Sequence, residues 1–137
     1  MSEGIRLLVC GGRDFQDEVL LIRVMAALRQ SKEVSLIIHG GARGADAMAH
    51  RYASRNGITA LCFLANWGKF GNAAGPIRNA EMLSEGKPDL VLAFPGGAGT
   101  RDMINRSLKA GVTVWKVRFD GLLEEATIPP MPGGDLD

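Results

Sequence analysis

The sequence predicts an α/β protein, a three-layer sandwich in which helices cover both faces of a five-stranded parallel sheet. Five short apolar runs alternate with segments whose apolar residues recur at helical spacing. Each expected strand-to-helix connection contains glycine. The chain has 137 residues, of which 46% are hydrophobic and 23% charged, as expected of one globular core. Apolar strands that alternate with helices indicate parallel pairing through right-handed crossovers.

The expected strands are the apolar runs over 5–10, 35–40, 59–64, 90–95 and 112–117. Two amphipathic helices follow from apolar residues at the i, i+3, i+4, i+7 spacing over 21–28 and 45–53. A third is predicted over 76–86, because proline is favoured at the first helical position. The fourth spans 100–110 and stops at Gly111. We expect the first and fourth strands to be neighbours, where the strand order reverses.

We expect one domain over 1–119 and a separate tail over 120–137. All 16 Lys and Arg residues precede Asp120, whereas 5 of the 15 Asp and Glu residues lie from Asp120 onward. The tail is acidic and rich in proline and glycine, which predicts a loosely docked segment outside the sheet. The first 119 residues carry a net charge of +6, from 16 basic and 10 acidic residues. This excess suits an anionic ligand, but its scatter disfavours nucleic acid as a partner.

The two cysteines, Cys10 and Cys62, both lie inside apolar runs, so we interpret them as core residues. They have no clustered His or Cys partners in the sequence and predict no metal site. No apolar run approaches the roughly 20 residues of a membrane span, and no cationic leader precedes an apolar stretch. We therefore expect a cytoplasmic protein that does not associate with membranes.

The loops after the strands are the expected ligand site, because all strand-to-helix loops of an open parallel sheet lie at its carboxyl edge. Each of the four loops contains glycine and one arginine. Glycine lets ligand atoms approach the backbone, a helix start offers N–H groups, and arginine adds charge, which together favour phosphate. The tight geometry of short connections is the alternative reason for these glycines. The candidate ligand-binding residues are Gly11, Gly12, Arg13, Gly40, Gly41, Gly44, Asp46, Arg78, Asn79, Pro95, Gly96, Gly97, Gly99, Thr100 and Arg101.

Further polar and aromatic residues of these loops each have two interpretations. Asp46 binds the ligand or organises its loop, and Asp14 receives ribose hydroxyls or caps a turn. His39 contacts a ligand or makes structural hydrogen bonds, of which the second is the commoner role. Trp67 and Phe70 stack on a base or anchor the long third loop to the core.

Three motifs in this order and spacing resemble the SLOG superfamily, and in particular its small YpsA-related single-domain branch. They read "HGGARGAD", "AGPIRNAEM" and "FPGGAGTRDM", and the resemblance covers roughly residues 5–118. The superfamily includes the Lonely Guy phosphoribohydrolases, the DNA-processing protein DprA and sensor domains proposed to bind nucleotide-derived ligands. The resemblance implies a Rossmann-like nucleotide-binding domain over 1–119. In it the PGGxGT turn holds the phosphate of a nucleotide. The residues themselves predict that Pro95 ends the strand and that Thr100 caps the helix and donates its hydroxyl to a phosphate oxygen.

The Lonely Guy enzymes are similar to this chain in one catalytic element and differ in another. Arg78 and Met82 match their R-x-x-x-M segment. Their catalytic glutamate stands three positions after the Thr of PGGxGT, where this chain has Met103, which can neither stabilise a cationic centre nor activate water. The candidate substitute is Asp102, one position earlier and rotated by about 100° on the helix. We favour the interpretation that Asp102 is a first-turn residue complementing the helix dipole.

We therefore expect binding of a nucleotide or a nucleotide-derived, ADP-ribose-like ligand, as in a sensor or ligand-binding module. Glycine loops would supply N–H donors, Arg78 and Arg101 would oppose phosphate charge, and Asp46 and Asn79 would contact the sugar. The alternative is a phosphoribohydrolase, similar to the Lonely Guy enzymes, that cleaves the N-glycosidic bond of a nucleoside 5′-monophosphate. No cofactor is implied besides a bound nucleotide. A homodimer is expected, because dimers are the commonest soluble assembly.

Overall fold

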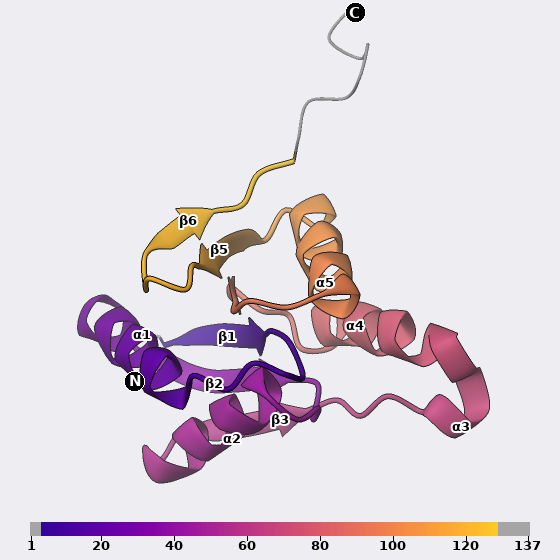
Figure 1. Ribbon diagram of the computed structural model, residues 1–137, viewed down its shortest axis with the longest axis horizontal. Coiled ribbons are helices and arrows are strands. Elements are labelled where there is room, and N and C mark those ends of the chain that lie inside the picture. The colour runs from indigo at the N-terminus through magenta and orange to yellow at the C-terminus, as the bar shows by residue number, and fades with distance from the viewer. Residues whose placement is uncertain (1–3, 129–137) are drawn as a thin grey trace, which may run out of the picture.

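The computed structural model describes residues 4–128, so the expectations for 129–137 lie outside the described residues. Within them the chain forms a six-stranded sheet in the order β3-β2-β1-β4-β5-β6 (Figure 1). The strands β1 to β5 pair in parallel. The six strands are β1 (Ile5–Cys10), β2 (Val34–His39), β3 (Thr59–Cys62), β4 (Leu90–Ala93), β5 (Thr113–Val117) and β6 (Leu123–Glu125).

The sixth strand corrects the expected sheet. β6 pairs antiparallel with β5 at the sheet edge, with Lys116 opposite Glu124, so the segment after Asp120 is not wholly outside the sheet. A tight reversal makes this pairing possible, because Gly121 takes a left-handed φ of 87° and donates its N–H to Arg118 O at 2.9 Å. Antiparallel neighbours need only such a short connection.

The prediction that the first and fourth strands are neighbours is confirmed, because β1 pairs with β4. Leu7 lies opposite Leu90, and Cys10 lies opposite Ala93. From β1 the chain continues outward through β2 and β3, whereas from β4 it continues in the other direction through β5 and β6. The strand order therefore reverses between β1 and β4, and the loops after these two strands border the crevice where such sheets bind ligands.

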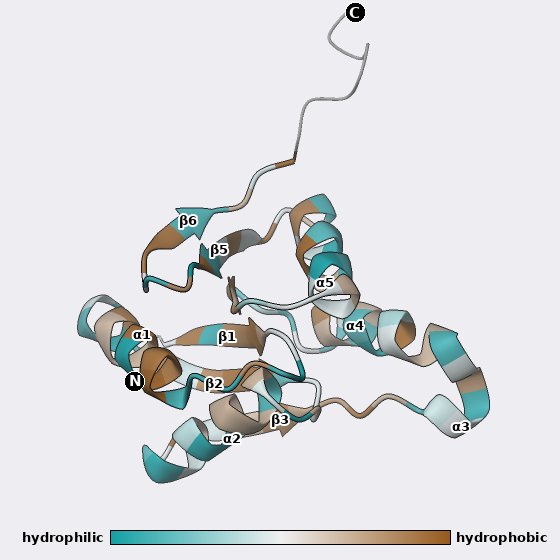
Figure 2. Cartoon of the chain, viewed as in Figure 1, coloured by the Kyte–Doolittle hydropathy of each residue, from teal (hydrophilic) through white to brown (hydrophobic). Residues whose placement is uncertain are grey.

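The helices form two layers around the sheet, as predicted. Successive residues of β1 point to opposite faces, so Leu7 packs in a core with α1 and α2, while Leu8 packs in a core with α4 and α5. In Figure 2 the central strands are largely hydrophobic, whereas hydrophilic residues recur along the helices. The helical segments are α1 (Glu18–Ser31), α2 (Ala45–Arg55), α3 (Trp67–Phe70), the 3₁₀ turn η1 (Gly71–Ala73), α4 (Ala74–Ser84) and α5 (Ala98–Lys109).

The start of α5 differs from the sequence-based prediction. The helix begins at Ala98, its N-cap is Gly97, and Thr100 lies inside the first turn with 8% of its surface exposed. Thr100 folds back onto the turn, so a Cβ at Gly96 would collide with its hydroxyl oxygen. The prediction that Thr100 caps the helix is therefore wrong. The predicted stop is present, because Gly111, which follows the C-cap residue Ala110, has a left-handed φ of 79°.

A membrane span is not among these elements. Of the helices within residues 4–128, none is long and apolar enough to cross a bilayer.

Candidate functional site

A pocket of about 450 Å³ lies at the reversal of the strand order. Its walls come from the turn after β1, the start of α2, the first turns of α4 and the glycine turn that leads into α5. We call it the central pocket. Its lining includes many of the residues predicted from sequence, namely Gly11, Gly12, Arg13, Asp46, Arg78, Asn79, Gly97, Gly99, Thr100 and Asp102.

A second hollow of about 400 Å³ adjoins the central pocket on the side of β2 and β3. The two share Arg13, Ala42, Trp67 and Arg78 as lining residues, and Gly40, Gly41, Arg43 and Leu64 belong to the second hollow. Gly44 lines neither cavity. Its left-handed φ of 78° and its contact with the Gly12 carbonyl, where a Cβ would collide, give it a role in the turn.

Some of the predicted residues line a third hollow, of about 700 Å³, and not the central pocket. Pro95, Gly96 and Arg101 line it, together with Thr100 and side chains after β5 such as Phe119. The structure therefore does not bring Arg101 and Arg78 to the same cavity. Adjacent residues on a helix point about 100° apart, so Arg101 and Asp102 face different sides of the start of α5.

The glycine turn presents open backbone to the central pocket. The first N–H groups of α5 have no partner within the helix, and they lie at the positive end of its dipole. A Cβ at Gly97 or Gly99 would meet nothing within 4 Å, so the space beside these residues is open. Gly96 is instead packed, because a Cβ there would lie 2.7 Å from the Gly12 nitrogen. This combination of free N–H groups and open space is typical of anion sites.

Two arginines bring positive charge to the same place. Arg78 extends from α4, and its guanidinium donates hydrogen bonds to the Gly40 carbonyl oxygen and to Asn79 Oδ1. Burial lowers the pKa of Arg78 from its ordinary value, whereas the charge of Asp46 raises it. The guanidinium carbon of Arg13 lies 5.0 Å above the ring of Trp67. The shared wall of the two cavities therefore carries two cations and an aromatic ring.

Asp46 organises the loop between β2 and α2. The residue is only 7% exposed, and its Oδ2 accepts the N–H groups of Gly40 at 3.1 Å and Ala42 at 3.3 Å. Burial raises the pKa of Asp46, whereas the bonds from Ala42 and Gly40 and the charges of Arg78 and Arg13 lower it. The loop-organising interpretation of Asp46 is confirmed, and the carboxyl group also lines the central pocket.

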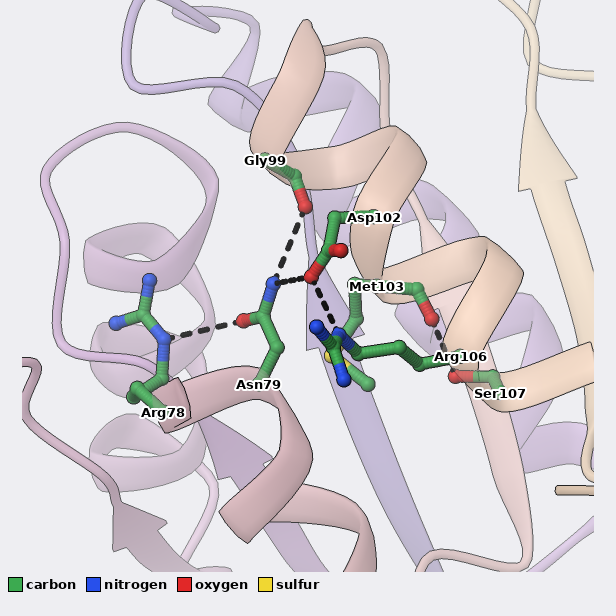
Figure 3. A network of polar contacts seen from close by, with 7 residues as sticks. All are labelled: Arg78, Asn79, Gly99, Asp102, Met103, Arg106 and Ser107. Carbon is green, nitrogen blue, oxygen red and sulfur yellow. Dashed lines mark hydrogen bonds and ion pairs between the residues drawn. The ribbon is translucent and has the colours of Figure 1, made fainter. Parts of the chain in front are cut away.

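A chain of polar contacts joins α4 to α5 beside the pocket (Figure 3). Asn79 Nδ2 donates to Asp102 Oδ2 at 2.9 Å and to the Gly99 carbonyl at 3.3 Å, and Asn79 Oδ1 accepts from Arg78 Nε at 3.1 Å. Arg106 Nε donates to the same Asp102 oxygen at 2.8 Å. The amide donors of Asn79 are thus both occupied by protein groups. Sequence reasoning missed Arg106, although its position four residues after Asp102 is a recognisable helical ion-pair spacing.

Asp102 and Met103 have different surroundings. Asp102 lies beyond the first turn of α5, which contains no acidic residue, so the first-turn interpretation is wrong. Its carboxylate belongs to the contact chain and lines the central pocket. Met103 is 1% exposed and packs in the core between the sheet and helices α4 and α5. Met103 also lines the central pocket, and its thioether offers no acid or base.

His39 and Asp14 do not line these cavities. His39 is buried, its Nδ1 accepts the Gly41 N–H at 3.0 Å, and its Nε2 lies 3.0 Å from His50 Nδ1. Burial, with the charges of His50 and Arg78, lowers the pKa of His39 to about 4. Asp14 is highly exposed and pairs with Arg43 at 3.1 Å. The structural interpretation of His39 is therefore confirmed.

The two aromatic residues of the third loop differ in position, and so do the two cysteines. Trp67 is 47% exposed and lines both adjoining cavities, whereas Phe70 lines none of the three. Cys10 is buried, as expected, and lies at the floor of the central pocket. Cys62 is exposed near the end of the edge strand β3, so its prediction as a core residue is wrong. Within residues 4–128, no three His, Cys, Asp or Glu side chains gather as a metal site.

The fold and this glycine-rich site agree with the sequence family. The chain belongs to the YspA, cpYpsA-related SLOG family (YAcAr), whose model matches residues 5–70. It is 38% identical over 117 residues to the Gene 61 protein of Mycobacterium phage D29, an alignment that covers 80% of this chain and 93% of the phage protein. The resemblance to the YpsA-related SLOG branch is therefore confirmed. The matched range of the family model includes the loops after β1 and β2 and ends before α4.

Proposed function

We propose that the protein binds a nucleotide or a nucleotide-derived ligand, as a sensor or ligand-binding module. The observation that carries the proposal is the open glycine turn at the start of α5, which faces the same pocket as Arg78. Backbone N–H groups, a helix dipole and a guanidinium converge there, and each favours the same kind of group, a phosphate. Membership of the SLOG family supports a nucleotide-related ligand.

The phosphate would lie beside Gly97 and Gly99, with Arg78 opposing its charge. The rest of the ligand would extend toward the second hollow, where Trp67 presents an exposed aromatic ring. Asn79 has a positioning role in this proposal rather than a contact with the sugar, because both of its amide donors already bond to Gly99 and Asp102. It orients Arg78 through the bond to Nε.

A phosphoribohydrolase is the second candidate function, and the position of Asp102 in the central pocket favours it. Hydrolysis of an N-glycosidic bond needs an acid or base near the sugar. In this chain Met103 stands where the enzymatic relatives have their glutamate, and Asp102 Oδ2 already accepts two bonds from protein groups. We therefore propose binding without appreciable turnover.

Calorimetric titration with AMP tests the proposed phosphate position. Gly99→Ala places a methyl group in open space, so the fold tolerates it, and the reduced freedom of the unfolded chain stabilises the protein by about 0.4–1 kcal/mol. The same methyl group would displace a phosphate from the turn. We expect Gly99→Ala to raise the melting temperature and to weaken AMP binding by about tenfold or more.

Arg78→Ala tests the positive charge in the same experiment. We expect it to weaken AMP binding by about tenfold or more, because a hydrogen bond to a charged group contributes roughly 1.5–3 kcal/mol. The exposed Arg23 on α1 lines none of the three cavities, and Arg23→Ala serves as the matched control. Unchanged AMP affinity in both Gly99→Ala and Arg78→Ala would overturn the proposed site.

A further inference from the structure

The two carboxylate oxygens of Asp46 differ in the hydrogen bonds that they accept from the protein. Oδ2 accepts both backbone bonds, from Gly40 and from Ala42. Within residues 4–128, no group donates a hydrogen bond to Oδ1. A carboxylate oxygen has two lone pairs, so a strong acceptor remains unused in a residue that is more than nine-tenths buried.

The unused oxygen is not sealed inside the protein. None of the described residues has a fully buried side-chain nitrogen or oxygen atom that lacks a partner, so Asp46 Oδ1 keeps some access to the outside. Of the three cavities described, Asp46 lines the central pocket alone. A ligand in the pocket can therefore reach this oxygen.

The surroundings of Asp46 Oδ1 favour a hydroxyl group of the ligand as its hydrogen-bond donor. A carboxylate repels phosphate, so the phosphate lies at the glycine turn and Arg78, and a different part of the ligand faces Asp46. Burial disfavours the charged carboxyl group, and a donor from the ligand would compensate for lost solvation. In a nucleotide the sugar adjoins the phosphate, and in Rossmann-type sites an acidic residue accepts hydrogen bonds from ribose hydroxyls.

We propose that Asp46 selects ribonucleotides over deoxyribonucleotides, because its Oδ1 accepts a hydrogen bond from the vicinal hydroxyls of ribose. This inference rests on the proposed function and concerns the sugar specificity of the same site. It predicts a ligand class defined by its sugar, whichever base the second hollow accommodates. The bonds from Gly40 and Ala42 hold the carboxyl group in place before the ligand arrives.

Calorimetric titration of the unmodified protein tests this inference without any substitution. The probes are AMP, 2′-deoxy-AMP and 3′-deoxy-AMP, followed by GMP, CMP and UMP with their 2′-deoxy counterparts. We expect at least one missing hydroxyl to weaken binding by about tenfold or more, the range of a hydrogen bond to a charged acceptor. We expect the same direction for every base that binds.

The variant Asp46→Asn tests the assignment to this residue. Its amide oxygen can still accept from Gly40 and Ala42, so the loop keeps its two backbone bonds, but the charged acceptor is lost. We expect the preference for ribose to fall to about threefold or less. Asp14→Asn is the control, because Asp14 is an exposed carboxylate that lines none of the three cavities, and it should keep the full preference.

The outcomes distinguish this inference from the proposed function. Equal binding of ribo- and deoxyribonucleotides would overturn the role of Asp46 and leave nucleotide binding intact. A ribose preference that persists in a folded Asp46→Asn variant, as judged by circular dichroism, would also overturn it. No binding of any of these nucleotides would contradict the proposed function, and the inference with it.

Discussion

Asn79 on α4 donates a hydrogen bond to Asp102 on α5 at 2.9 Å, and the same carboxylate oxygen accepts from Arg106 at 2.8 Å. This pair connects the helix that carries Arg78 to the helix whose start forms the glycine turn. The two halves of the proposed phosphate site are therefore held together by a buried amide, since Asn79 is only 4% exposed.

Removing this amide should destabilise the fold. Asn79→Ala removes the acceptor of Arg78 Nε and one of the two donors to Asp102 Oδ2, and polar groups left unpaired in this way cost about 1–3 kcal/mol. We expect the free energy of unfolding to fall by that amount, seen as a lower urea midpoint, together with weaker AMP binding. The control is Asn105→Ala, at an exposed position of α5. Equal urea midpoints for the two variants would contradict the structural role of Asn79.

Trp67 should contribute to binding through the base and not through the phosphate. Stacking of a base on an aromatic ring contributes about 1–3 kcal/mol, so Trp67→Ala should weaken AMP binding by about tenfold. Binding of ribose 5-phosphate, which has no base, should stay unchanged. Phe70→Ala is the matched control, because Phe70 is similarly exposed and lines none of the three cavities. An equal loss for both ligands would show that Trp67 only supports the loop.

The buried His39 should make the protein sensitive to acid. Its pKa in the folded state is about 4, below the ordinary 6.5, because burial and nearby positive charges disfavour the imidazolium. Between these values the unfolded chain binds a proton that the folded chain does not, so stability falls as the pH decreases from 6.5 to 4. The loss from this group approaches about 3 kcal/mol at the lower end. His39→Asn should remove this part of the pH dependence.

Urea unfolding at several pH values between 7 and 4.5 measures this effect. The relevant quantity is the difference in unfolding free energy between the protein and His39→Asn. That difference should change steadily in favour of the variant as the pH decreases. A difference that stays constant with pH would contradict the assignment of a neutral, buried His39.

Turnover of nucleoside monophosphates should be slight or absent. Incubation with AMP, GMP, CMP or UMP, followed by chromatography of the free base, should show no release above the buffer control. The reason is that Met103 and Asp102 provide no free acid or base, because a thioether cannot transfer a proton and Asp102 Oδ2 already accepts two hydrogen bonds. Turnover that disappears in Asp102→Asn but persists in Asp14→Asn would make Asp102 catalytic and the binding-only proposal wrong.

The sheet and its switch point could be predicted because their signals are local. Apolar runs and helical spacings lie within single segments, and their alternation determines parallel pairing. β6 could not be predicted in this way. Its three residues, Leu123–Glu125, are exposed and too few for a periodic pattern, and their place depends on the Gly121 turn and on pairing with β5.

The composition of the site could be predicted better than its contacts. Glycines and arginines are visible in each loop, but Asn79 and Asp102 are 23 positions apart, and no local pattern joins them. The separation of Arg101 from Arg78 depends on the rotation of α5 about its axis, which tertiary packing decides. The exposure of Cys62 likewise follows from the edge position of β3.

The most direct test of nucleotide binding at the glycine turn is an NMR titration of ¹⁵N-labelled protein with AMP. The proposed site predicts that the largest amide shifts occur at Gly97, Ala98, Gly99 and Thr100, with a further shift at Gly12 across the pocket. Saturation by AMP with these amides unshifted, and with the shifts gathered instead around Lys116 and Phe119 in the third hollow, would contradict it.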